Sequence, residues 1–209
     1  MAYIIEVFEW RQGFFLRAIA LIGLAGLAGC SEEKAPASSE GSSSIIVAPE
    51  ETDHLWVFAE SAHELGSGGE FHIYIDPETH PNARISFSRF ALGVEGALPE
   101  HVHRKTEEIA YFLSGRGMVR TQINGQPQEV EVGPGHVWYV APGEPHAIRN
   151  IADEPLILVF AIIPQAEKGL LSFFRRIGAK PGEMAEALSP EEFAALAAEH
   201  DLILVPPEQ

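Results

Sequence analysis

Two stretches of the 209-residue chain decide its fold: His101-Val-His-Arg-Lys-Thr-Glu-Glu108-Ile-Ala-Tyr-Phe-Leu-Ser-Gly115 and Gly135-His-Val-Trp-Tyr-Val-Ala-Pro-Gly143-Glu-Pro-His146-Ala-Ile-Arg-Asn150. His101 and His103 lie two residues apart, so on an extended strand both side chains leave the same face of a sheet. Glu108 opens an apolar run that predicts a second strand after a short turn. His146 follows a Pro-Gly turn and begins a further predicted strand. Three imidazoles and one carboxylate at these spacings suit a single metal ion.

The order of residues in the two stretches resembles the paired motifs of the cupin superfamily. In the first stretch, four residues stand at the positions of the family motif. The glycine that precedes them, Gly96, lies one residue closer to His101 than in the family motif. In the second, four more are in register, but Ala141 takes the place of a proline, which follows one position later. The residues in register are His101, His103, Glu108, Gly115, Gly135, Gly143, His146 and Asn150. The 19 residues between Gly115 and Gly135 also suit the family.

This resemblance implies a metal site formed by His101, His103, Glu108 and His146. Buried imidazoles and a buried carboxylate are costly without a cation, which supports that reading. The ligand types suit one divalent transition metal, and iron, manganese, nickel, copper and zinc all remain open. Glu107 is the alternative to Glu108, but the six-residue spacing to the following glycine favours Glu108 and places Glu107 on the opposite face.

Short predicted strands separated by turn signals fill residues 45–164. Asn124-Gly125 lies between two of them and predicts a type I′ hairpin. Residues 155–163 are almost entirely apolar, which predicts a buried strand. The predicted strands are 71–75, 84–94, 118–123, 128–132, 137–140 and 155–163. Such a series forms a closed double sheet or small barrel, so the fold class is all-β. The resemblance specifies a double-stranded β-helix, the jelly-roll or cupin barrel, and because the sequence has no visible internal repeat we expect a single copy.

Residues 165–209 lack the series of short strand patterns seen before them and predict a short helical extension. Residues 167–177 carry apolar side chains at helical spacing. Ser189-Pro-Glu-Glu192 is a capping box with proline at the first helical position. Residues 202–205 have the composition of a short strand. We expect this extension to cover one edge of the barrel or to support a homodimer contact, rather than to form a catalytic lid.

Residues 1–29 resemble the signal peptide of a bacterial lipoprotein. Arg17 precedes an apolar run, 18–29, that is too short to span a bilayer as a helix but has the length of a signal-peptide core. The run ends Leu27-Ala-Gly-Cys30, which resembles a lipobox and implies lipidation of Cys30. This is the only cysteine in the chain, so an intrachain disulfide is excluded. The two glutamates before Arg17 are unusual in a leader and leave a downstream start codon open.

Residues 30–44 are rich in serine and lack apolar anchors, which predicts a flexible tether. We therefore expect a lipid-anchored protein on the periplasmic face of the bacterial cell envelope. Ser31, by resemblance to known lipoproteins, favours the outer membrane, and the inner membrane stays open. The net charge of −16 argues against nucleic acid or an anionic lipid surface as a partner. The expected partner is a small-molecule substrate or ligand.

The predicted ligand set leaves one or two positions open on a five- or six-coordinate ion, unlike a closed structural site. Three roles fit: a dioxygenase for a chelating diol or enolate, a Lewis-acid isomerase or lyase, and a non-catalytic ligand-binding module. Ala110 and Phe112 share the face of Glu108, and Ile148 shares that of His146, which predicts apolar walls. The site resembles that of flavonol dioxygenases, whose metal-bound glutamate also acts as a base. The leading prediction is therefore a dioxygenase with Glu108 as its catalytic residue.

The remaining histidines and the other polar and aromatic residues of the motifs are not predicted to be metal ligands. Asn150 is expected to make a structural hydrogen bond. His136, Trp138 and Tyr139 either line the mouth of the site or pack. The histidines expected to face solvent are His54, His63, His72, His80 and His200.

Overall fold

The computed structural model describes residues 44–206. The expected signal peptide, the lipidated Cys30 and all but the last residue of the tether lie outside the described residues. Within 44–206, no helix is both long and apolar enough to cross a membrane.

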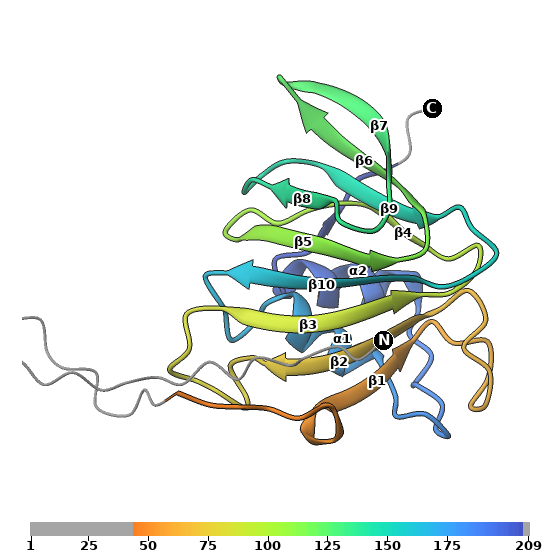
Figure 1. Ribbon diagram of the computed structural model, residues 1–209. Helices are drawn as coiled ribbons and strands as arrows, with labels where there is room; N and C mark the ends of the chain where they lie inside the picture. Colours follow the sequence, from red (N-terminus) through yellow and green to blue (C-terminus); the bar gives the residue numbers. More distant parts are fainter. Residues whose placement is uncertain (1–43, 207–209) are drawn as a thin grey trace, which may run out of the picture. The chain divides into compact units, whose positions relative to one another are not determined.

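Among the described residues, ten of eleven strands form two antiparallel sheets from residues 53–163, and the short strand at residues 203–204 joins one of them (Figure 1). One sheet has the order β1-β2-β3-β10-β5-β8, and the other has the order β11-β4-β9-β6-β7. The strands are β1 (Asp53–Val57), β2 (Gly69–Ile75), β3 (Ser86–Leu92), β4 (Ala97–Val102), β5 (Glu107–Ser114), β6 (Gly117–Ile123), β7 (Gln126–Val132), β8 (Val137–Val140), β9 (His146–Asn150), β10 (Leu156–Ile163) and β11 (Ile203–Leu204). The helices are the 3-10 turn η1 (Pro49–Glu51), α1 (Leu170–Ile177) and α2 (Pro190–Glu199). The all-β jelly-roll prediction is confirmed.

Strand β10 lies inside the six-stranded sheet because its sequence is apolar on both faces. It pairs with β3 on one side and with β5 on the other. Leu156, Leu158, Phe160 and Ile162 are all buried and point into the barrel. This strand therefore holds β5, which carries Glu108, against the rest of the core.

The predicted hairpin is present between β6 and β7. Asn124 and Gly125 have φ values of 54° and 73°, as a type I′ turn requires, and the paired strands run in register from Gly117↔Val132 to Ile123↔Gln126. Asn150 also has its expected structural role. Its side-chain amide donates to the carbonyls of Leu92, Gly93 and Glu154, and its side-chain oxygen accepts from Ala152.

The C-terminal extension packs against the barrel core in two ways. Helix α1 buries Leu170, Leu171, Phe173, Phe174 and Ile177, which belong to the same apolar cluster as the inward side chains of the strands. Helix α2 begins at the predicted capping box, where Ser189 Oγ accepts from the Glu192 amide. Strand β11 then pairs with the edge of β4, so the extension covers one edge of a sheet as expected. Figure 1 shows both helices behind β3 and β10, on one side of that sheet.

Candidate metal centre

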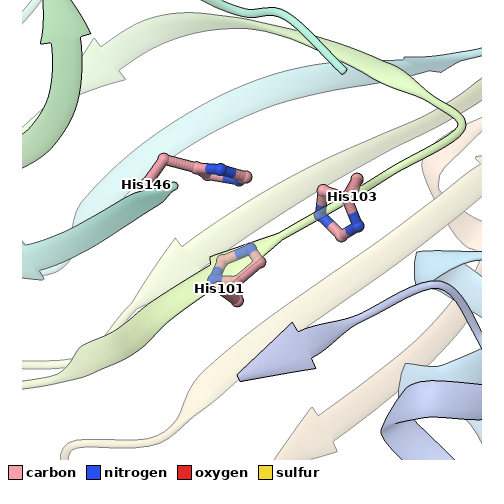
Figure 2. Close-up of side chains that lie close together, drawn as sticks. All are labelled: His101, His103 and His146. Atoms are coloured by element: carbon pink, nitrogen blue, oxygen red, sulfur yellow. The ribbon is translucent and has the colours of Figure 1, made fainter. Parts of the chain in front are cut away.

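Three histidines meet on the inner side of the five-stranded sheet (Figure 2). His101 lies on β4 directly opposite His146, the first residue of the neighbouring strand β9. His103 follows the end of β4. The three side chains are 2–6% exposed, and their ligand atoms lie within 4.8 Å of one another. The shared face predicted for His101 and His103 is therefore present, with His146 brought to it by strand pairing.

Each imidazole is oriented by a main-chain carbonyl. Because a carbonyl oxygen can only accept, each Nδ1 must carry the proton, which leaves the lone pair on Nε2. This is the arrangement in which histidine usually binds a metal through Nε2. The contacts are His101 to Pro99 at 2.8 Å, His103 to Asp201 at 3.1 Å and His146 to Glu144 at 2.9 Å.

Two of the free nitrogens are buried without a partner. Nε2 of His103 and Nε2 of His146 make no hydrogen bond within the described residues. A buried polar atom in that state costs about 1–3 kcal/mol. A cation between the imidazoles would satisfy both atoms, so the residues present fit a metal ion.

Glu108 reaches the same point from the other sheet. Its Oε2 lies 3.9 Å from His103 Nε2 and 3.8 Å from His146 Nε2, and its side chain is 12% exposed. Ligands about 2.1 Å from one ion are separated by about 3.0–3.4 Å, so a small inward movement would complete the set. Glu107 points to the opposite face, where its carboxylate accepts a hydrogen bond from Tyr139 Oη at 2.7 Å. The structure thus places Glu108, and not Glu107, beside the histidines.

Burial controls the protonation of this cluster in the absence of an ion. It raises the pKa of Glu108 to about 7 and lowers the pKa of His146 to about 4. The pKa of His101 is lowered well below its usual range by burial and by the neighbouring His146 and His103, and burial also lowers the pKa of His103. At neutral pH the imidazoles are therefore uncharged, with lone pairs available to a metal.

An apolar cavity opens on one side of the site. Among the described residues that line it, the only ionisable side chains are His101, Glu108 and His146. Trp138 is the member of the His136–Tyr139 group that lines the cavity, and its ring stands edge-on to His146 at a centroid distance of 5.6 Å. The remaining aromatic residues of the lining are Phe58, Phe71, Phe90, Phe160, Phe173, Phe174 and Phe193.

The C-terminal extension forms part of this cavity wall, which the sequence did not lead us to expect. Both helices and β11 contribute apolar side chains to it. The physical reason is that α1 is strongly amphipathic, and its apolar face packs against the core side chains of the barrel. The contributing residues are Leu170, Phe173, Phe174, Phe193, Leu202 and Leu204.

Four histidines outside the motifs are less exposed than predicted, since His54, His72 and His80 are partly buried and His200 is buried. His54 and His72 face each other across β1 and β2 and stack at 4.2 Å, and Glu70 contacts His54 Nε2 at 2.8 Å. These three residues form a second group of ligand type, half-buried outside the core. His200 is buried and donates from Nδ1 to the Leu196 carbonyl, whereas His63 is exposed as predicted.

Comparison with known proteins agrees with this geometry. The cupin domain family matches residues 88–162. An uncharacterized protein of Methanocaldococcus jannaschii is 31% identical over 90 residues, which cover 43% of this chain and 69% of that protein.

Solved structures with a similar chain path include a predicted oxalate decarboxylase from Thermotoga maritima, with 25% identity, a TM-score of 0.47, and coverage of 57% of this chain and 99% of that one. Another is the Bacillus subtilis oxalate decarboxylase, with 24% identity and a TM-score of 0.43, where the match covers 47% of this chain and 26% of that one. The chain thus spans about a quarter of the Bacillus protein. On the family match, the related sequence and the jelly-roll fold, this chain belongs to the cupin superfamily.

Proposed function

We propose that His101, His103, His146 and Glu108 hold one divalent transition metal, and that the protein is a metal-dependent dioxygenase for a small organic substrate. The observation that carries the proposal is the convergence of three uncharged imidazoles and a buried carboxylate at the wall of an apolar cavity. Three nitrogens and one carboxylate are a typical set for iron, manganese, nickel, copper or zinc. When bound, a redox-active metal of this group supplies the site for chelation of the substrate and for its oxidation by dioxygen.

The protein residues supply orientation, a proton acceptor and the exclusion of water. The carbonyls behind the imidazoles fix the direction of each Nε2. Glu108 is the proposed catalytic residue, because its carboxylate lies at the cavity wall, where it could accept the proton of a substrate hydroxyl. The phenylalanines of the cavity keep bulk water from the substrate, which strengthens the electrostatic interactions inside.

The lining of the cavity supports an apolar substrate that enters uncharged and carries two neighbouring oxygens, such as an aromatic diol or an enol that becomes an enolate when it loses its proton. Aromatic side chains offer stacking and edge-to-face contacts to such a ring. A small dicarboxylate would meet no lysine or arginine among the described lining residues. The negative charge of the Glu108 carboxylate would also repel a dicarboxylate.

The test combines metal analysis with oxygen uptake. Protein purified with each candidate metal in turn would be assayed in an oxygen electrode against catechols, flavonols and small enolisable diketones. We expect about one ion per chain and oxygen uptake with at least one chelating aromatic substrate. Uptake must be absent from the double variant His103→Ala and His146→Ala. Turnover without oxygen uptake would favour the isomerase or lyase alternative, and tight binding without turnover would favour the ligand-binding module.

We propose in addition that the protein is anchored in the bacterial envelope through a lipid on Cys30. The support is the sequence: an apolar core of signal-peptide length that ends Leu27-Ala-Gly-Cys30. In a bacterial host, wild-type protein should fractionate with the outer membrane and incorporate labelled fatty acid. The Cys30→Ser variant should lose the label, and equal labelling of both proteins would refute the lipobox assignment.

A further inference from the structure

His103 is oriented differently from the other two histidines. His101 and His146 each donate to a carbonyl two residues earlier in their own segment, at Pro99 and Glu144. His103 lies in the turn between β4 and β5, and its Nδ1 donates instead to the carbonyl of Asp201, 98 residues later. The orientation of one imidazole therefore depends on the C-terminal extension, which lies outside the matched cupin region of residues 88–162.

Asp201 makes a second contact to the same turn. Its Oδ2 accepts a hydrogen bond from the Lys105 amide at 2.9 Å. Asp201 thus holds residues 103 and 105 at once, through its main chain and its side chain. It has a φ of 60°, in the left-handed region that aspartate and asparagine tolerate better than other residues with a side chain.

The residues on either side of Asp201 fix its place. The Leu202 amide donates to the Ala197 carbonyl at the end of α2. Strand β11 then pairs along β4, with Leu204 directly opposite His101, and the Val205 amide donates to the Glu100 carbonyl at 2.9 Å. The segment 201–205 therefore runs beside both histidines of the first motif.

We propose that Asp201 is a positioning residue for the metal site, and that binding of a metal and docking of segment 201–205 stabilise each other. The inference rests on the proposed metal site. Without the Asp201 carbonyl, the His103 ring loses the contact that directs Nε2 toward His146 and Glu108. Loss of such an orienting partner typically lowers metal affinity by about 10–100-fold. Because coupling is reciprocal, a bound ion must in turn hold the segment in place.

The test uses Co²⁺, whose visible spectrum reports the geometry of its ligands. Valine strongly disfavours a positive φ, so Asp201→Val should displace both contacts and weaken Co²⁺ binding by about 10-fold or more, with an altered spectrum. Asp201→Asn keeps an acceptor and tolerates the same φ, so it should restore wild-type affinity and spectrum. Asn124→Val is the matched control, because it introduces the same strain at φ 54° in the β6–β7 turn, away from the site.

Equal affinities and spectra for Asp201→Val and Asn124→Val would overturn the proposal while leaving the metal site intact. Failure of the wild-type protein to bind any candidate metal would instead remove the proposed function and this inference with it. A second measurement needs no variant. Co²⁺ should slow hydrogen exchange at the Lys105 and Val205 amides of the wild-type protein more than at amides of the β6–β7 hairpin. Exchange unchanged at Lys105 and Val205 in Co²⁺-loaded protein would also overturn the coupling.

Discussion

Replacing Glu108 with glutamine should stabilise the metal-free protein and weaken the metal-bound one. Burial raises the pKa of Glu108 from 4.5 to about 7. The folded protein therefore binds more protons than the unfolded chain between these values, so the contribution of this group to stability falls as pH rises from 4.5 to 7. The pKa of Glu108 differs by about 2.5 between the folded and unfolded chain. At 1.36 kcal/mol for each pKa unit, the buried charge therefore lowers the free energy of unfolding by about 3 kcal/mol above pH 7. Glutamine keeps the size and removes this cost.

Urea unfolding in EDTA would measure the effect. At pH 8 the Glu108→Gln variant should be more stable than wild type by up to about 3 kcal/mol, and at pH 4.5 the two should agree. Glu107→Gln is the matched control on the outer face, where the change should stay below about 1 kcal/mol. With saturating Zn²⁺ the order should reverse at pH 8, because the carboxylate favours binding to the native state. A metal-free Glu108→Gln variant that is less stable than wild type at pH 8 would refute the assigned burial of this charge.

Three further outcomes follow from the same site and its cavity. Elemental analysis of the His103→Ala and His146→Ala double variant should find almost no transition metal, and full occupancy would remove both residues from the ligand set. In EDTA, the lowered pKa of His146 predicts that stability falls as pH drops from 6.5 to about 4, because the unfolded chain binds the extra protons, and His146→Ala should flatten this dependence in thermal scans. Phe173→Ala should cost about 3–5 kcal/mol in urea unfolding because this ring is 1% exposed, and a loss below 1 kcal/mol would contradict its place in the core.

The strands were predictable because local rules determine them, whereas the jelly-roll arrangement and the joining of Glu108 and His146 to one site were predicted from the resemblance to the cupin motifs. The two-residue spacing of His101 and His103, and the alternation that separates Glu108 from Glu107, follow from strand geometry. Asn124-Gly125 predicts its turn because few residue pairs accept two positive φ values. The apolar sequence of β10 likewise predicted its burial between two neighbours.

The features that were missed depend on contacts between distant segments. Nothing near Asp201 in the sequence indicates that its carbonyl meets His103, because the contact arises only when β11 pairs with β4. The pairing of His54 with His72 depends on the register between β1 and β2, which the 11-residue connection does not reveal. The sequence shows that α1 has an apolar face, but it does not show which part of the barrel this face packs against. The position of α1 in the cavity wall could therefore not be predicted.

The candidate ligands come from both sheets, and this has a mechanical consequence. His101 and His146 belong to β4 and β9 of the five-stranded sheet, whereas Glu108 belongs to β5 of the six-stranded sheet. An ion bound by all of them would form a reversible crosslink between the two sheets. The layers could then part only after a metal–ligand bond had broken. Removal of the ion should therefore loosen the barrel first between β4 and β5, where the short turn that carries His103 already relies on a contact from the far end of the chain.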